Sequence, residues 1–181
     1  MRYIMIVLSL TLVVAACAPA ATVQPFEPME GARSFSLLVD GAPAVRAGST
    51  HSVDARQYGV QATIERDRVV VELTNETAGP MVVHPDRSRF VLADGATSPV
   101  ATGATSWENR DEPQESVEIP SGGTTILTLI PRSNLSWNGE LVIAPMFPWP
   151  LTELITLRID LGIETVSGVE TIALIVTGRP D

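Results

Sequence analysis

The stretch Ile155-Thr156-Leu157-Arg158-Ile159-Asp160-Leu161-Gly162-Ile163-Glu164 carries the strongest amphipathic pattern in the chain. Every second residue is a branched apolar one, and polar or small residues stand between them. Because successive side chains of a β-strand point to opposite faces, this alternation predicts a strand with one apolar face. On a helix the same apolar residues would wind around every side. The pattern therefore favours a β protein.

Two hairpins are predicted from the order of strands and turns. The turn Thr165–Gly168 leads to Val169–Thr177, which we expect to pair antiparallel with the predicted strand Ile155–Glu164. Earlier in the chain, Val60–Glu65 and Arg68–Asn75 flank a short polar turn at residues 66–67, and both flanking segments alternate apolar and polar residues. Antiparallel neighbours are therefore expected to dominate the sheet.

Further short apolar runs lie between Gly, Pro and Asp turns. They are Ser34–Val39, Met81–His84, Arg89–Leu92, Pro99–Ala101, Ser116–Ile119 and Thr124–Ile130. The segment Gly41–Gln57 has no clear pattern, and no segment has convincing helical periodicity. Together the runs predict an all-β fold, an antiparallel immunoglobulin-like β-sandwich of about 8–9 strands, with an up-and-down barrel as the alternative.

The N-terminus resembles a bacterial lipoprotein signal. One positive charge at Arg2 precedes an apolar run from Tyr3 to Val14, which is shorter than the roughly 20 residues that a membrane span needs. The tetrad Val14-Ala15-Ala16-Cys17 is similar to the lipobox, in which the cysteine is lipidated after cleavage before it. We expect residues 1–16 to be a cleaved signal, residues 17–33 a lipidated Cys17 with a Pro-rich tether, and residues 34–181 the β-sandwich domain.

Lipidation on Cys17 would attach the chain firmly to a membrane, since each buried methylene contributes about 0.8 kcal/mol. Ala18 follows the cysteine, where lipoproteins retained in the inner membrane usually carry Asp. The resemblance therefore implies a cell-envelope location, with the outer membrane favoured where the organism has one. The alternative is an ordinary secreted protein.

Composition excludes some classes of function. The formal net charge of −9 makes nucleic-acid binding unfavourable because phosphate would be repelled. A single cysteine cannot form an intramolecular disulfide, so packing has to supply the stability.

The middle and end of the chain resemble an uncharacterised group of bacterial envelope lipoproteins with one β-sandwich domain. The resemblance is carried by Val71–Thr77 before Pro80, Asp86–Gly95, Ile119–Gly123, Leu129–Pro131, and Trp137 ahead of Ile143–Pro148. His84-Pro85 departs from it where an aromatic residue is expected. The resemblance implies a fold and a cellular location, but no activity and no catalytic residues.

Residue types that commonly build catalytic or metal sites are scarce. His51 and His84 are the only histidines, so the chain offers few residues for a Ser-His-Asp triad or a His-rich metal site. Met81 and His84 would face opposite sides of a strand, which argues against a shared copper ion. The loop from Trp107 to Glu115 is rich in carboxylates and lacks the spacing of a dedicated calcium loop, so a solvated loop is favoured. We predict no catalytic residues, no metal ligands and no cofactor.

Three aromatic residues, Trp137, Phe147 and Trp149, stand in a Pro-rich segment near the C-terminal strands. Exposed rings would form a patch for a partner protein or a glycan, whereas packing over the sandwich edge is the more ordinary role. We keep these three residues as candidate partner-binding residues.

The resulting hypothesis is a non-enzymatic, membrane-anchored envelope lipoprotein with a structural or binding role. An assembly or inhibitor module that binds an envelope protein is the alternative. A hydrolase that uses carboxylates of the Glu108–Glu115 loop is the weaker one, and it requires two of them facing a cleft.

Overall fold

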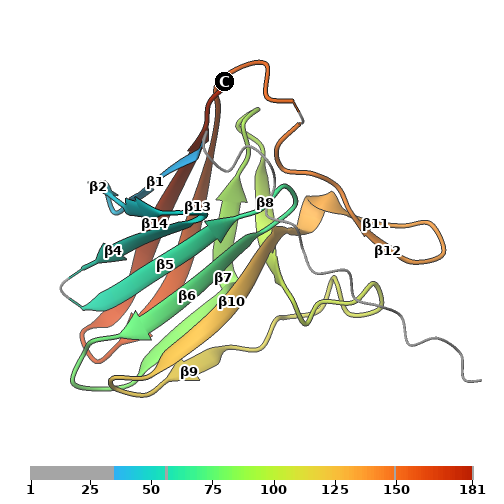
Figure 1. The fold of residues 1–181 in the computed structure, drawn as a ribbon. Coiled ribbons are helices and arrows are strands. Elements are labelled where there is room, and N and C mark those ends of the chain that lie inside the picture. The colour runs from blue at the N-terminus through green and yellow to red at the C-terminus, as the bar shows by residue number, and fades with distance from the viewer. Residues whose placement is uncertain (1–34, 56, 149, 181) are drawn as a thin grey trace, which may run out of the picture.

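The computed structural model describes residues 35–55, 57–148 and 150–180, and in this part of the chain it contains strands, one short 3-10 helix and no α-helix (Figure 1). The elements are β1 (Phe35–Val39), β2 (Ala42–Pro43), β3 (Val45–Ala47), β4 (Thr50–Asp54), β5 (Tyr58–Ile64), β6 (Val69–Asn75), β7 (Met81–Val91), β8 (Thr97–Thr102), β9 (Val117–Ile119), β10 (Thr124–Pro131), η2 (Arg132–Asn134), β11 (Leu135–Trp137), β12 (Leu141–Ile143), β13 (Ile155–Thr165) and β14 (Gly168–Gly178). Within the described residues, no helix is long and apolar enough to cross a membrane. The predicted signal, Cys17 and the predicted tether lie outside these residues.

The hairpin of β13 and β14 confirms the prediction made from alternation. All eleven residues of β13 pair with β14, from Ile155↔Gly178 to Thr165↔Gly168. The alternating apolar residues face the core, as do Ile172, Leu174 and Val176 of β14. Apolar burial on one face therefore sets the register of this pair.

The hairpin of β5 and β6 also forms as predicted, in register from Tyr58↔Asn75 to Ile64↔Val69. The turn is closed by the Glu65 N–H donating to the Arg68 carbonyl at 2.9 Å. Arg68 also bonds both carboxylate oxygens of the adjacent Asp67, at 3.0 and 2.8 Å.

Apart from β11 and β12, which form a separate pair, twelve of the described strands form one antiparallel sheet that nearly closes on itself. Its order is β2-β1-β14-β13-β7-β8-β10-β6-β5-β4-β3, with β9 attached to β7. The two ends of this path, β2 and β3, are separated in sequence by Ala44 alone. In Figure 1, β4, β5, β6 and β10 form one layer over β7, β13 and β14. The order is not the sequential one of an up-and-down barrel.

The strand β8 connects the two layers. Its first half, Thr97–Pro99, pairs with β7, and its second half, Val100–Thr102, pairs with β10. One main core lies between the layers. Its largest fully buried side chains are Leu37, Leu73, Met81, Phe90, Ile119, Leu129, Phe147, Leu157, Ile159, Leu161, Ile163 and Ile172.

The described residues contain fourteen strands, more than the predicted 8–9. The excess comes mainly from two- and three-residue pieces, β2, β3, β11 and β12. Such pieces carry too few residues for an alternation to be visible, and their pairing depends on distant strands. The all-β antiparallel class is as predicted.

Candidate functional site

A partly exposed aromatic surface joins the loop after β8 to the hairpin of β11 and β12, with Trp107 and Arg110 half-buried and Trp137 exposed. The rings of Trp107 and Trp137 stack with centroids 6.1 Å apart and an interplanar angle of 23°. The guanidinium carbon of Arg110 lies 3.4 Å from the Trp107 ring centroid. Trp137 remains 47% exposed. We call Trp107, Arg110 and Trp137 the Trp107–Trp137 platform.

The platform rests on two supported segments. Trp137 ends β11, which pairs with β12 in a separate two-stranded sheet from Leu135↔Ile143 to Trp137↔Leu141. Leu135 anchors that hairpin in a small second core with Ala101 and Ile130. On the other side, the Ser106 N–H donates to Asn109 Oδ1 at 2.6 Å, which shapes the loop carrying Trp107.

The predicted partner-binding residues separate in the structure. Trp137 is exposed, whereas Phe147 is fully buried and meets the Phe35 ring edge-on at 4.7 Å. Phe147 is therefore a core residue whose ring is out of reach of a partner, because the segment after β12 folds back and the Met146 N–H donates to the Arg66 carbonyl. Trp149 lies outside the described residues. The second ring of this surface is Trp107, which stacks on Trp137. In the sequence, Trp107 stands out only as a member of the carboxylate-rich loop.

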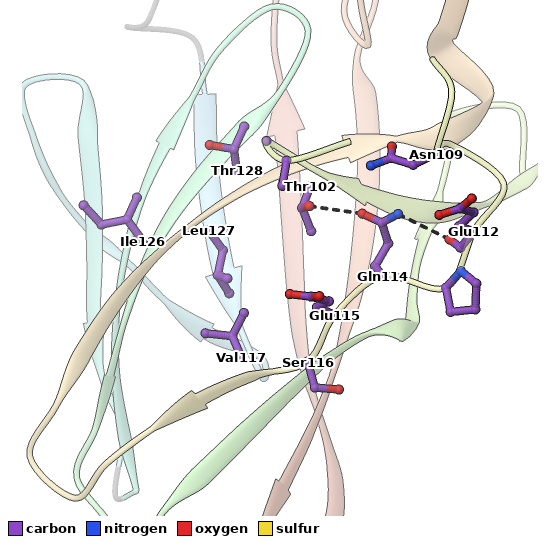
Figure 2. Close-up of a pocket in the computed structure, with 13 residues that line it drawn as sticks. Thr102, Asn109, Glu112, Gln114, Glu115, Ser116, Val117, Ile126, Leu127 and Thr128 are labelled. Carbon is purple, nitrogen blue, oxygen red and sulfur yellow. Dashed lines mark hydrogen bonds between the residues drawn. The ribbon is translucent and has the colours of Figure 1, made fainter. Parts of the chain in front are cut away.

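A cavity of about 540 Å³ lies beside this loop, between β10 and the residues that lead into β9 (Figure 2). Its polar lining includes Thr102, Asn109, Glu112, Gln114, Glu115, Ser116 and Thr128, and its apolar lining includes Val117, Ile126 and Leu127. The volume falls within the range of small-ligand sites, roughly 300–1,000 Å³.

Gln114 holds the loop wall of the cavity in place. Its Oε1 accepts hydrogen bonds from the Thr105 and Thr102 hydroxyls, at 2.7 and 3.1 Å. Its Nε2 donates to the Glu112 carbonyl at 3.3 Å, and Figure 2 shows the side chain between Thr102 and Glu112. Its backbone N–H donates to Asp86 Oδ1 at 2.7 Å. The loop is thus tied to both β8 and β7.

The acidic loop divides into two sets of carboxylates. Glu112 and Glu115 line the cavity, and both are exposed. Glu108 and Asp111 are also exposed but are not among the cavity-lining residues. The pKa of Glu108 lies below its usual value, first because of a hydrogen bond from its own backbone and second because of one from Ser106. In the part of the chain that the structure describes, no three His, Cys, Asp or Glu side chains gather as a metal site.

His84 connects three elements through its ring nitrogens. Nδ1 lies 2.9 Å from Ser116 Oγ, and Nε2 lies 3.0 Å from Glu164 Oε2. Arg87 Nη1 lies 3.8 Å from the same Glu164 oxygen. This Ser116–His84–Glu164 line was missed from the sequence, because its members stand 32 and 80 residues from His84. Ser116 also lines the cavity.

The fold and these surfaces define an all-β domain with a partly exposed aromatic platform and an acidic cavity. No family model and no curated protein matches the chain. A solved structure described as the "X-ray structure of Northeast Structural Genomics Consortium target SoR45" is similar at 13% identity, over 82% of this chain and 88% of that chain, with a TM-score of 0.35. A similarity of this size carries no argument about function.

Proposed function

We propose that this protein is a lipid-anchored lipoprotein of the bacterial envelope whose folded domain binds an envelope partner and has no enzymatic role. The lipobox ending at Cys17 supports the anchor. The Trp107–Trp137 platform supports the binding role and is the observation that carries it. The outer membrane is the favoured location, because Ala18 stands where retention signals carry Asp.

The platform has the character of a binding anchor. Tryptophan and arginine are enriched among residues that dominate binding energy. Tryptophan buries a large area with only two rotatable side-chain bonds, and the planar arginine guanidinium stacks on aromatic rings. Arg110 and Trp137 both contact the Trp107 ring, so the platform is assembled before any partner arrives. The platform side chains would therefore lose little conformational entropy when a partner binds.

At the finer level of the fold, we retain the immunoglobulin-like sandwich as a proposal. Two facing layers around a shared core support it. An experimental structure whose strand order cannot be matched to that class would remove this part of the proposal.

Labelling cells with a clickable fatty acid tests the anchor. The wild-type protein is expected to carry the label and to sediment with membranes, and the Cys17→Ala variant to carry none. Label retained on the Cys17→Ala variant would contradict the assignment.

Crosslinking in intact cells tests the platform. A photoreactive residue beside Trp137 is expected to capture a discrete partner, and Trp137→Ala to weaken that capture at least tenfold, about 1.4 kcal/mol of binding. Leu154→Ala is the matched control, because Leu154 is 62% exposed and lies outside the platform. Equal capture by both variants would exclude the platform as the binding surface.

A hydrolase is the second candidate, favoured by one observation: Glu112 and Glu115 line the same cavity. Two carboxylates facing one site can act as acid and base. Assays with chromogenic ester and glycoside substrates test it. Activity that Glu112→Gln or Glu115→Gln abolishes would replace the non-enzymatic proposal.

A further inference from the structure

The nearly closed sheet has a gap between β9 and β10. Residues Thr124–Leu129 of β10 pair with β6 on one side, but only Leu129–Pro131 pair with β8 on the other. β9 pairs with β7 alone. Among the described residues, Thr124–Thr128 therefore have no strand on their second side, and β9 has none on its side toward β10.

The gap widens into the cavity of about 540 Å³. β9 and β10 are joined by the turn at residues 120–123, and the cavity lies at the opposite end, bounded by Val117 on β9 and by Ile126, Leu127 and Thr128 on β10 (Figure 2). An unpaired strand edge presents backbone donors and acceptors that an extended chain can satisfy.

The loop at residues 112–115 forms the side of the cavity opposite β10 and is fixed in place. The hydrogen bonds of Gln114 to Thr102, Thr105 and Asp86 fix the loop to neighbouring strands. Binding of an extended segment would therefore require no rearrangement of this loop.

The negative charge of the cavity lining indicates the kind of segment that fits the gap. Glu112 and Glu115 line the cavity, and no arginine or histidine stands among the lining residues. The side chain of Ile126, at the unpaired edge, is 66% exposed and supplies an apolar contact. Carboxylates beside free backbone groups favour an extended peptide that carries basic side chains.

We propose that the gap between β9 and β10 binds an extended, basic segment of a partner protein, which adds a strand to the free edge of β10. The segment's backbone pairs with Thr124–Thr128, and its Lys or Arg side chains face Glu112 and Glu115. This interaction goes beyond the proposed function, because it uses a surface other than the Trp107–Trp137 platform.

A random octapeptide library, screened against the purified full-length protein in detergent, tests the proposal. The selected peptides are expected to be rich in Lys or Arg alternating with β-branched residues. In hydrogen exchange, they are expected to slow the amides of β9 and of the first half of β10. A library that yields no binder, binders without basic residues, or protection elsewhere would each overturn the proposal.

Two variants test the carboxylates and the free edge of β10 in turn. The double variant Glu112→Gln, Glu115→Gln is expected to weaken the selected peptides at least tenfold, whereas the exposed control pair Glu140→Gln, Glu153→Gln leaves affinity unchanged. Ile126→Lys adds a repelling charge at the free edge and is expected to abolish binding, while the unfolding midpoint is retained because the side chain is exposed. Undiminished binding by either test variant would contradict the proposal. Trp137→Ala is expected to leave peptide binding intact, so the two surfaces can fail separately.

Discussion

Asn75 is fully buried and uses both ends of its amide. Nδ2 donates to the Gly79 and Ile119 carbonyls at 2.8 and 2.9 Å. Oδ1 accepts from the Thr77 N–H and hydroxyl at 2.9 and 2.7 Å. The Asn75-Glu76-Thr77 motif of the family resemblance is thus a structural device that joins the end of β6 to the end of β9.

Replacing Asn75 by Ala should lower the free energy of unfolding by about 2–4 kcal/mol, because buried carbonyls and an N–H lose their partner. Urea unfolding measures the change. Asn138→Ala, in the exposed turn between β11 and β12, should cost less than about 0.5 kcal/mol. Similar losses for the two variants would show that the Asn75 hydrogen bonds contribute little.

The Ser116–His84–Glu164 line has the residue types of a nucleophilic site, and we expect it to be structural, joining β7 and β13 to the start of β9. A fluorophosphonate probe should therefore leave Ser116 unlabelled in the native protein. Mass spectrometry of the treated protein checks this. Labelling at Ser116 that His84→Gln prevents would identify an activated serine and refute the non-enzymatic proposal.

At the scale of single elements, β13 meets β7 across an irregularity between Asp160 and Gly162. The Gly162 N–H donates to Ser88 Oγ at 3.0 Å. A Cβ at Gly162 would lie 3.0 Å from Arg87 Cβ and 3.3 Å from the Arg87 carbonyl oxygen. The two strands can approach this closely because the residue is glycine.

Gly162→Ala should destabilise the domain by about 1–3 kcal/mol, since backbone has to shift to admit the methyl group. Thermal unfolding of the variant measures the loss. Gly59→Ala is the control, because its Cβ would meet its nearest neighbour, Glu76 Oε1, at 3.4 Å. A Gly162→Ala variant as stable as Gly59→Ala would mean that the strands adjust freely.

Asp160 fastens the same pair of strands. It is 5% exposed, and its carboxylate accepts from Arg158 Nε at 2.6 Å and from Arg89 Nε at 3.0 Å. Burial alone would raise the pKa of Asp160, but the hydrogen bonds from the two arginines outweigh burial and hold that pKa below its usual value of 3.8.

Because this pKa is lowered on folding, the carboxylate stabilises the domain above pH 3.8, and the contribution is lost as the pH falls through the folded-state pKa. Asp160→Asn should therefore cost about 1–2 kcal/mol at neutral pH, since both arginines stay half-exposed, and the difference from wild type should shrink below pH 4. Urea unfolding across a pH series measures it. A difference that stays constant into strong acid would rule out the charge as its source.

At the scale of the whole molecule, side-chain hydrogen bonds connect strands that are not paired through their backbones. Tyr58 on β5 donates its hydroxyl to Asp40, whose other carboxylate oxygen accepts from the Ala173 N–H on β14 at 2.7 Å. His51 Nε2 on β4 donates to the Phe35 carbonyl on β1 at 3.1 Å. These contacts link the two layers near the ends of the sheet path.

Burial, and after it the hydrogen bond to Asp40, raises the pKa of Tyr58 well above its ordinary value of 10. The neutral hydroxyl thus contributes stability that is complete below pH 10 and is lost as the pH rises toward the folded-state pKa. Tyr58→Phe should cost about 1–2 kcal/mol at neutral pH, and its disadvantage should shrink in alkali. Tyr58 is the only tyrosine in the described residues, and the other tyrosine of the chain, Tyr3, lies in the predicted signal. In protein that lacks residues 1–16, tyrosinate absorbance should therefore appear only as the domain unfolds. Absorbance that rises near pH 10 in the folded protein would contradict the link.

The all-β class, the hairpins of β5 with β6 and of β13 with β14, and the turns that close them could be predicted from the sequence. Each of these depends on residues close together in the chain, where alternation and turn residues act directly. The resemblance of Val14–Cys17 to a lipobox is likewise visible in a short stretch of sequence, because a signal of this kind depends only on neighbouring residues.

The near-closure of the sheet and the positions of the proposed binding surfaces depend on the tertiary structure. Trp137 and Phe147 look alike in sequence, yet one stacks on Trp107 at the surface and the other is enclosed by both layers. The Ser116–His84–Glu164 line and the gap beside β10 likewise bring together distant segments. Their positions follow from strand order, which is set by burial summed over the whole core and is not encoded at any one place in the chain.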